Sequence, residues 1–377
     1  MQNISIAFFT WGLSSDAITN IAAALAQGFW ELGIRKIYVL YLNGSPEKNI
    51  SFPKGVEFVH LGVHRARLAP LPIAQFLRSV NPTFFISLAF LNIAAILGWL
   101  LPGKHTTKLI ISQQNTLIYK AQVEHQGELL MQIQLRLARF LYSRVSGLVA
   151  TTPSLLQELI QEVGVCLPTK RTAVISNLVN IRLVQAQAQV TTNHSWFCPK
   201  DKPVILSVAR LAKQKNFPLL LKAYTLIRRQ LDVRLMIIGE GVEREVLEQQ
   251  IQELDLTQDV SLPGSSENPW SIMSQVDIFV LPSEEEAFGL VLVEAMACGL
   301  PVVATNAIAG GPRSIIGDSE YGILVPNGDA QKLAEAVVKV LTSEDLRNQL
   351  IACGKDRCKA FDPQIIAKQW LLFMEQL

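Results

Sequence analysis

The stretch DIFVLPSEEEAFGLVLVEAMACGLPVVAT, residues 277–305, contains a complete strand–helix–strand unit. An apolar run opens it, an acidic loop follows, and the apolar residues from Leu290 onward predict a helix that ends at Gly299. Pro301 opens a second apolar run, which predicts another strand. Neither run alternates with polar residues, which indicates parallel strands that are covered on both faces.

The same pattern recurs along the whole chain. Short apolar runs alternate with helical stretches, and this alternation predicts parallel sheets joined by right-handed crossovers. The runs are 4–10, 36–42, 56–62, 83–88, 108–113, 147–152, 172–176, 203–209, 233–239, 260–264, 277–282, 301–305 and 322–326. We therefore expect two doubly wound α/β domains in tandem, with a ligand between them near the carboxyl ends of the strands.

The boundary between these domains is predicted at Arg182–Lys202, a stretch rich in Gln, Thr and Asn that lacks a clear apolar period. We interpret it as the interdomain connection. The predicted divisions are an N-terminal domain at 1–182, a C-terminal domain at 183–362, and a last helix at 363–377 that can pack back on either domain.

One stretch, 84–101, is almost wholly apolar and about long enough to cross a bilayer. Ser87, Asn92 and Gly98 interrupt it, and the surrounding pattern favours a buried strand followed by a short apolar helix. The first ten residues lack a basic segment and a small-residue cleavage site, so they predict a first strand rather than a signal peptide.

The composition narrows the class of protein. Apolar residues make up 49% of the 377 residues, which supplies ample core. The formal net charge of +2 is too balanced for a dedicated nucleic-acid binder, so we expect no nucleic-acid partner. The five cysteines include no CxxC pair, and this favours free thiols in a reducing compartment over a disulfide framework or a zinc site.

Two cations, Arg210 and Lys215, lie in the loop between the predicted strand at 203–209 and a helix that begins near Pro218. Asn216 is a plausible N-cap for that helix. A guanidinium and an ammonium beside a helix N-terminus suit a diphosphate group. From this fragment alone, a solvated basic loop is an equally good interpretation.

Two carboxylates, Glu286 and Glu294, flank the start of the apolar helix in the opening stretch. Helical side chains lean toward the N-terminus, so both can face the same ligand beside the backbone N–H groups of Phe288, Gly289 and Leu290. Glu294 is the only charge in that helix, and ribose hydroxyls would satisfy it. The alternative is a buried glutamate paired with a nearby cation.

Two glycine-rich turns, 238–241 and 309–314, stand between predicted strands and helices. Each suits a tight structural turn as well as a loop beside a donor. No Asp-x-Asp pair occurs in the sequence, although many nucleotide-sugar enzymes hold a divalent cation with one. Its absence predicts a metal-free diphosphate site built from Arg210, Lys215 and helix N-termini.

Taken together, these motifs resemble the retaining glycosyltransferases of family 4. The resemblance covers nearly all of residues 203–328 and includes the Arg210–Lys215 loop, the Glu286–Glu294 motif and the segments 294–305 and 321–326. It implies a GT-B fold, in which two Rossmann-like doubly wound parallel-sheet domains face each other across a cleft. It also implies retention of anomeric configuration, independence of metal and a C-terminal helix that crosses to the N-terminal domain.

The resemblance further implies roles for single residues. Arg210 and Lys215 would bind the donor diphosphate, Glu286 the hydroxyls of the donor sugar, and Glu294 the ribose. Backbone amides from Phe288 through Gly289 to Leu290 would meet sugar and phosphate, and the base would lie near Ser261–Pro263, hence near Leu262. Glu286, Arg210 and Lys215 are the expected catalytic residues.

The first half matches this family more loosely. Many members have a Gly-Gly turn after the first strand, where this chain has Trp11 and Gly12, and we include Gly12 among the expected donor-binding residues. Gln114 stands where a histidine is common, Ala287 where glycine is usual, and Ser314 where glutamate is usual. These departures concern the acceptor side and the catalytic rate more than donor binding.

The sequence therefore predicts a retaining, metal-independent glycosyltransferase without a cofactor, which takes a nucleotide diphosphate sugar and a glycan or lipid-linked acceptor in envelope polysaccharide or glycolipid synthesis. The alternatives are a sugar-nucleotide epimerase or phosphorylase of the same fold, and a non-catalytic module that binds a sugar nucleotide. We expect a cytoplasmic protein, either free or peripheral at the inner face of the membrane.

A membrane contact is suggested by the predicted helix Glu128–Ser146, where Arg136, Arg139 and Arg144 lie among Leu, Phe and Tyr. A core helix with a solvated basic edge explains the same pattern equally well.

Overall fold

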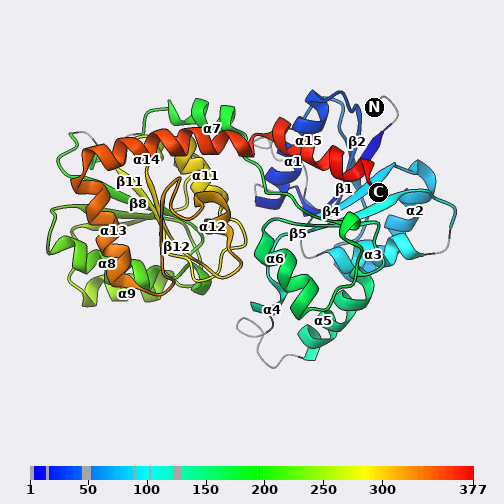
Figure 1. Ribbon diagram of the computed structural model, residues 1–377, viewed down its shortest axis with the longest axis horizontal. Coiled ribbons are helices and arrows are strands. Elements are labelled where there is room, and N and C mark those ends of the chain that lie inside the picture. The colour runs from blue at the N-terminus through cyan, green and yellow to red at the C-terminus, as the bar shows by residue number, and fades with distance from the viewer. Residues whose placement is uncertain are drawn as a thin grey trace. The chain divides into compact units, whose positions relative to one another are not determined.

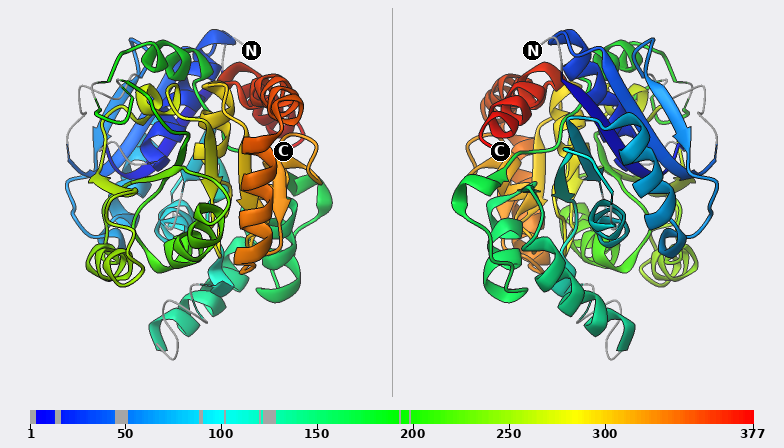
Figure 2. Two further views of the ribbon diagram at one scale, coloured as in Figure 1. Left: turned by 90° about the vertical axis from the view of Figure 1, so that its left-hand side faces the viewer. Right: turned by 90° about the vertical axis from the view of Figure 1, so that its right-hand side faces the viewer.

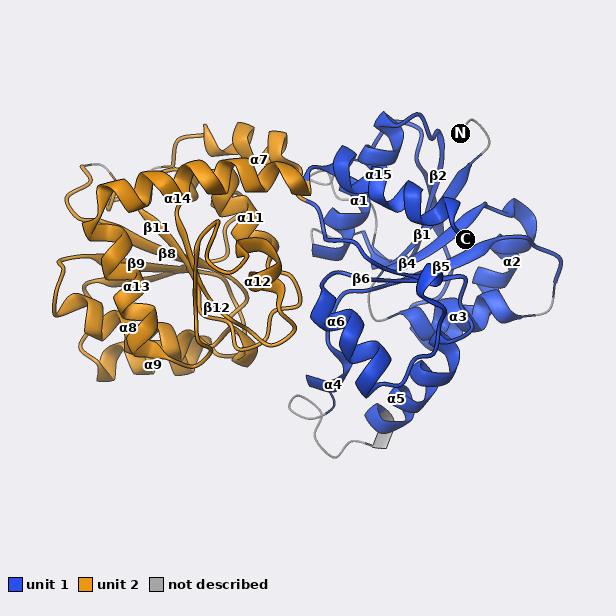
Figure 3. Cartoon of the chain, viewed as in Figure 1, with its two compact units in different colours: residues 1–178, 362–377 blue, residues 179–361 orange. Residues whose placement is uncertain are grey.

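The protein is represented by a computed structural model that describes residues 4–13, 17–44, 52–88, 91–101, 103–119, 121, 129–192, 194–197 and 199–377. The chain divides into two compact units (Figure 3). Unit 1 is Met1–Leu178 with Asp362–Leu377, and unit 2 is Val179–Phe361. Each unit contains one parallel sheet, which confirms the predicted α/β fold class.

Unit 1 holds a seven-stranded sheet in the order β3-β2-β1-β4-β5-β6-β7 (Figure 1). Its strands are β1 Ser5–Gly12, β2 Lys36–Asn43, β3 Glu57–His60, β4 Phe84–Leu88, β5 Lys108–Gln113, β6 Gly147–Ala150 and β7 Thr172–Val174. Its helices are α1 Ala17–Glu31, α2 Pro70–Val80, α3 Asn92–Leu100, α4 Leu117–Tyr119, α5 Leu129–Tyr142, α6 Pro153–Gln157 and α15 Pro363–Glu375, with a π-helical turn at Glu158–Glu162.

Unit 2 holds a six-stranded sheet in the order β10-β9-β8-β11-β12-β13. Its strands are β8 Val204–Val208, β9 Arg234–Ile238, β10 Val260–Gly264, β11 Ile278–Leu281, β12 Val302–Thr305 and β13 Ile323–Val325. Its helices are α7 Ile181–Ala188, α8 Phe217–Arg228, α9 Arg244–Glu253, α10 Pro269–Met273, α11 Leu290–Ala297, α12 Gly311–Ile316, α13 Ala330–Thr342 and α14 Glu344–Arg357. Each apolar run that predicted a strand, in either half of the sequence, overlaps one of these strands.

The central strands of unit 2 are mostly apolar because helices cover both faces of the sheet. One core cluster joins the sheet to α8, α9 and α13, and a second joins its other face to α7, α10, α11 and α12. All four residues of β11 and all four of β12 are buried between these layers. This rigid double layer fixes the strand ends from which the loops of the site begin.

The last helix of the chain, α15, belongs to unit 1 and packs against α1 (Figure 2). The two helices approach closely because Gly28 has no side chain. A Cβ at Gly28 would lie 2.3 Å from the carbonyl oxygen of Pro363 and 2.8 Å from Cβ of Ala367. Gly147 of β6 leaves similar room for Phe373, so the end of the chain is part of the core of unit 1.

Two sequence-based interpretations can be compared directly with the structure. The stretch 182–202, interpreted as the interdomain connection, lies in unit 2, where α7 packs on α10 and α11. Its mixed Gln and Ala composition concealed a helix of which only Ile181, Val184 and Ala188 are buried.

The apolar stretch 84–101 is the strand β4 followed by the helix α3, as predicted. Within the described residues, no helix combines the length and apolarity needed to cross a membrane.

Candidate functional site

The candidate site of unit 2 lies where the strand order of its sheet reverses. β8 and β11 are neighbours, paired in parallel at Ile205 with Ile278 and at Leu206 with Phe279. The chain runs from β8 to β9 on one side of this pair and from β11 to β12 on the other. Loops diverge at such a point, and ligands of open α/β sheets bind beside the carboxyl ends of the strands there.

An ion pair joins the loops that follow β8 and β11. Lys215 closes a 3₁₀ turn after β8, and its Nζ lies 2.5 Å from Oε2 of Glu286, which follows β11. The side chains are only 16% and 12% exposed, respectively. The hydroxyl of Ser283 donates a further hydrogen bond of 3.3 Å to the same carboxylate oxygen. The structure thus brings together two of the three residues predicted to be catalytic.

Arg210, the third of these residues, differs from Lys215 and Glu286 in its exposure and in its contacts. Its side chain is exposed and forms no hydrogen bond or ion pair with any described residue. A guanidinium offers five N–H donors in a planar fork, which matches the oxygens of a phosphate. Arg210 is therefore free to bind an anion, whereas Lys215 is already held by Glu286.

Glycines hold the loop of Arg210 in place from one side. A Cβ at Gly239 would lie 1.9 Å from the carbonyl oxygen of Ala209, and one at Gly241 would lie 2.2 Å from that of Leu211. The close approach permits hydrogen bonds from the amide of Leu211 to the carbonyl of Glu240, and from the amide of Glu243 to the carbonyl of Leu211. The turn at 238–241 is thus a structural support for the Arg210 loop.

The loop that carries Glu286 is held from both sides by backbone hydrogen bonds. The amide of Glu284 donates to the carbonyl of Gln214, and the amide of Glu286 donates to that of Ile308. The carbonyl of Glu286 accepts from the amide of Gly311, where a Cβ would lie only 2.4 Å from that oxygen. The second glycine-rich turn therefore also supports the site. Sequence reasoning did not find Gln214 or Ile308, because their contribution is a main-chain carbonyl.

Three consecutive amides end this loop at the start of α11. The backbone N–H groups of Phe288, Gly289 and Leu290 have no hydrogen-bond acceptor among the described residues. Gly289 has φ of 92°, a left-handed conformation that glycine adopts without strain, and it turns the chain into the helix. A Cβ there would lie 3.3 Å from Cγ of Glu286, so these amides start beside the ion pair.

Glu294 lies one turn into α11 and is partly buried. No cation pairs with it in the described part of the chain, which argues against the alternative of a structural ion pair. Burial raises the pKa of this carboxyl, and the indole N–H of Trp270 acts in the opposite direction. We regard that contact as loose, because the buried indole nitrogen reaches no acceptor at hydrogen-bonding geometry. The carboxylate is thus left to a ligand.

Two predicted donor residues remain, Leu262 and Gly12. Leu262 is in the edge strand β10, and its carbonyl accepts from a guanidinium N–H of Arg244, which also pairs with Glu240. Gly12 ends β1 in unit 1, where its carbonyl accepts from the hydroxyls of Thr10 and Thr19.

The structure also shows the surroundings of three positions that depart from the family pattern, Gln114, Ala287 and Ser314. Gln114 is buried, donates to the hydroxyl of Ser112 and accepts from the side-chain amide of Asn177 at 2.8 Å. Ala287 is buried in the Glu286 loop. Ser314 donates to the carbonyl of Gly310 and so stabilises the first turn of α12.

A polar cluster that sequence reasoning missed lies at the same edge of unit 1 as Gln114. The side-chain amide of Asn92 donates to Oε1 of Gln113 and to the hydroxyl of Tyr142, each at 3.2 Å. Burial raises the pKa of Tyr142 to about 12, so its phenol stays protonated and donates to Gln113. The carbonyl oxygen of Asn92 is buried without a partner.

One detail of the Lys215 loop differs from the prediction. Asn216 was a candidate N-cap for α8, but its side chain accepts no amide of that helix. It has φ of 49° instead, and it ends the 3₁₀ turn that carries Lys215. Asparagine tolerates this left-handed conformation better than most residues, so its contribution is to the backbone turn.

Comparison with known proteins gives a family match for the second unit. Residues 191–357 match the family described as glycosyl transferases group 1, in agreement with the resemblance found from the motifs of the sequence. A relative in Campylobacter jejuni subsp. jejuni serotype O:2 is 32% identical over 63% of this chain and 62% of its own length. It is an N-acetylgalactosamine-N,N'-diacetylbacillosaminyl-diphospho-undecaprenol 4-alpha-N-acetylgalactosaminyltransferase. The chain spans between 45% and 62% of the length of the first three curated relatives.

Solved structures share the fold over nearly the whole chain. Anabaena HepE in complex with UDP is 20% identical, with a TM-score of 0.77 over 99% of this chain and 100% of its own. Sucrose-phosphate synthase from Thermosynechococcus elongatus is 21% identical, with a TM-score of 0.80 over 99% of both chains. At this level of identity the likeness establishes the fold, which is GT-B.

The contrast between the two cations yields a stability test. Lys215→Met should destabilise unit 2 by roughly 1–3 kcal/mol, because it leaves the carboxylate of Glu286 buried without its partner. Arg210→Met is the matched control and should change stability little, since Arg210 has no partner to lose. Urea unfolding of both variants measures the difference. Equal stability of the two would show that Lys215 and Glu286 do not pair.

Glu294 gives a test with a defined pH dependence. Its pKa is raised in the folded protein, so the stability that the protonated form provides is present below the unfolded pKa and is lost as pH rises through the folded value. Glu294→Gln removes the buried charge and should therefore raise the melting temperature at pH 8 without nucleotide, with a difference that shrinks toward pH 4. A variant less stable than wild type at pH 8 would contradict the absence of a structural partner.

Proposed function

We propose that this chain is a retaining, metal-independent glycosyltransferase, which moves a sugar from a nucleotide diphosphate donor to a glycan or lipid-linked acceptor in envelope polysaccharide or glycolipid synthesis. The observation that carries the proposal is the Lys215–Glu286 pair, together with Arg210 and three amides that have no partner among the described residues, all within the stretch that matches the glycosyl transferases group 1 family. This set offers positive charge and N–H donors to a diphosphate, and a carboxylate to sugar hydroxyls.

The donor follows from the chemistry of each group. Its diphosphate meets Arg210 and the amides from Phe288 to Leu290, since a helix N-terminus and a guanidinium both favour phosphate. Its ribose hydroxyls donate to Glu294, whose carboxylate lacks a cation in the described part of the chain. The base lies near Leu262. HepE was solved with UDP, so UDP is the first nucleotide to test.

The reaction we propose is driven by electrostatic stabilisation of the leaving group. As the bond between sugar and diphosphate breaks, negative charge grows on the phosphate oxygens, where Arg210, Lys215 and the amides are already oriented. Glu286 orients the sugar and, through its ion pair, also holds Lys215 in position. The acceptor oxygen bonds to the anomeric carbon on the face that the diphosphate leaves, and its proton passes to the departing phosphate oxygen, so the anomeric configuration is retained.

No metal is needed in this scheme, because cationic side chains and amides take the place that a divalent cation holds in other nucleotide-sugar enzymes. The described residues contain no group of three or more His, Cys, Asp or Glu side chains arranged to hold a metal ion. Unit 1 supplies the acceptor side, with unit 2 as the donor domain.

The acceptor and the cellular location are proposed together. The Campylobacter relative is named for a substrate on diphospho-undecaprenol, a lipid carrier. A lipid-linked acceptor would place this chain at the cytoplasmic face of a membrane, as a peripheral protein. The comparisons do not favour an epimerase or a non-catalytic module. An epimerase would convert the donor without an acceptor, and a module would bind it without turnover.

The direct test is a transfer assay with a donor panel and lipid-linked or glycan acceptors. Wild-type turnover should survive EDTA, because no step requires a metal. Glu286→Gln should lower kcat by about 10²-fold with little change in KM, since this carboxylate contacts the part of the donor that reacts. Glu294→Gln should chiefly raise KM, because the ribose does not change during the reaction.

Three results would overturn the proposal. The first is activity that EDTA abolishes and manganese restores. The second is Glu286→Gln with wild-type kcat in a folded protein. The third is conversion of donor that proceeds equally well without acceptor. Ser283→Ala is a matched control, because it removes only the 3.3 Å hydrogen bond to Glu286 and should cost far less activity than Glu286→Gln.

A further inference from the structure

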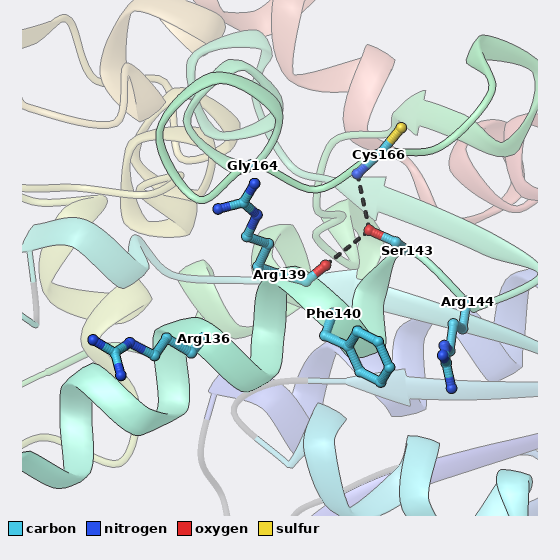
Figure 4. A pocket seen from close by; sticks show the side chains of 7 residues that line it. All are labelled: Arg136, Arg139, Phe140, Ser143, Arg144, Gly164 and Cys166. Carbon is cyan, nitrogen blue, oxygen red and sulfur yellow. Dashed lines mark hydrogen bonds between the residues drawn. The ribbon is translucent and has the colours of Figure 1, made fainter.

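A basic pocket lies in unit 1. It is lined by Arg136, Arg139, Phe140, Ser143, Arg144, Gly164 and Cys166, and its volume is about 460 Å³ (Figure 4). The first five come from α5 and the residues that follow it, and the last two from the segment after the π-helical turn. We call it the arginine pocket. Its volume falls in the range of small-molecule sites.

The arginine pocket carries charge without a counterion among the described residues. None of its three guanidinium groups forms an ion pair or a hydrogen bond with a described carboxylate. The guanidinium of Arg144 lies 3.8 Å from the centre of the Phe140 ring, which holds its side chain by a cation–π contact. Three like charges on one pocket repel one another, so an anion bound there would lower the energy of the arrangement.

Hydrogen bonds join the two walls of the arginine pocket. The hydroxyl of Ser143 donates to the carbonyl of Arg139 at 2.8 Å and accepts from the amide of Cys166 at 2.9 Å. Gly164 has φ of 80° and leaves room for Arg139, since a Cβ there would lie 3.1 Å from Nε. The end of α5 and the opposite wall are thus joined, and the arginines project from a fixed frame (Figure 4).

Apolar side chains accompany this charge on the same helix. Ile133, Leu137 and Phe140 are 42%, 41% and 56% exposed, and their spacing of four and three residues places them on one face of α5. Phe140 belongs to both the stripe and the pocket wall. A helix that presents large apolar residues to solvent beside several arginines is typical of helices that lie in a membrane interface.

We propose that α5 docks on an anionic lipid surface, with a lipid phosphate in the arginine pocket and the Ile133–Leu137–Phe140 stripe in the acyl boundary. The charge selects an anion, and the adjoining apolar stripe selects a lipid over free phosphate, which would leave those side chains in water. This inference rests on the peripheral membrane contact proposed above, and it is independent of the transfer reaction.

Vesicle flotation of the full chain tests the proposal with two triple variants. Arg136→Ala, Arg139→Ala and Arg144→Ala combined should weaken binding to vesicles of phosphatidylcholine with phosphatidylglycerol, by about fivefold for each arginine and so by roughly a hundredfold. Binding of wild type should fall with salt and be weak on phosphatidylcholine alone. Ile133→Gln, Leu137→Gln and Phe140→Gln combined should remove the binding that persists at high salt.

The matched control removes the same charge elsewhere. Lys222→Ala, Arg229→Ala and Lys339→Ala combined change exposed residues of unit 2 and should leave flotation at the wild-type level. A melting shift with UDP should be the same for wild type and both α5 variants, and this readout separates a failed lipid site from a failed donor site. Inorganic phosphate serves as the free-anion probe.

Two results would overturn the inference. One is equal flotation of wild type and both α5 variants on vesicles that contain phosphatidylglycerol. The other is wild type that does not float but is stabilised by inorganic phosphate while the arginine variant is not, which would make the pocket a site for a free phosphate group. Loss of flotation in the arginine variant but not in the unit 2 control is the result that the proposal requires.

Discussion

The contact between Lys215 and Glu286 is the interaction on which the candidate site depends. It links the loops after two adjacent strands, across 71 residues of sequence, at a point where both side chains are largely buried. Two such charges are tolerated there only because each compensates the other. Among the described residues, the side chain of Arg210 has no partner, and the amides at the start of α11 have no acceptor. The ion pair thus joins the two loops that carry the charged residues of the candidate site.

The second constraint on the site is that three positions in its supporting turns must be glycine, because no side chain fits there. Gly239 and Gly241 allow the backbone of the loop after β9 to pack closely against the Arg210 loop. Gly311 allows the start of α12 to pack in the same way against the Glu286 loop. In each case a Cβ would lie within 2.4 Å of a backbone oxygen, a distance that no rotamer change can relieve. The glycine-rich turns therefore buttress the two loops that carry the charges. Flexibility is not what these positions require, since their main-chain groups are hydrogen-bonded.

The fold could be predicted because strands buried on both faces leave an uninterrupted apolar run, as at 278–281 and 302–305. The helix α7 was missed because only Ile181, Val184 and Ala188 of it are buried, a pattern too sparse to stand out among Gln residues. For the site, residue types and their order indicated Arg210, Lys215, Glu286 and Glu294. Main-chain support from Gln214 and Ile308, and the pocket formed by α5 with Gly164, depend on long-range packing that no local pattern contains.

The central claim is that Glu286 faces the donor sugar while Lys215 and Arg210 face its diphosphate. Calorimetric titration of wild type and Glu286→Gln with UDP, or with the nucleoside diphosphate that gives the largest melting shift, tests it most directly. A nucleoside diphosphate lacks the donor sugar that Glu286 would contact, and its diphosphate charge is repelled by that carboxylate. The account predicts that Glu286→Gln binds the nucleotide more tightly than wild type, because Lys215 is released to the phosphates. Weaker binding by the variant would contradict it.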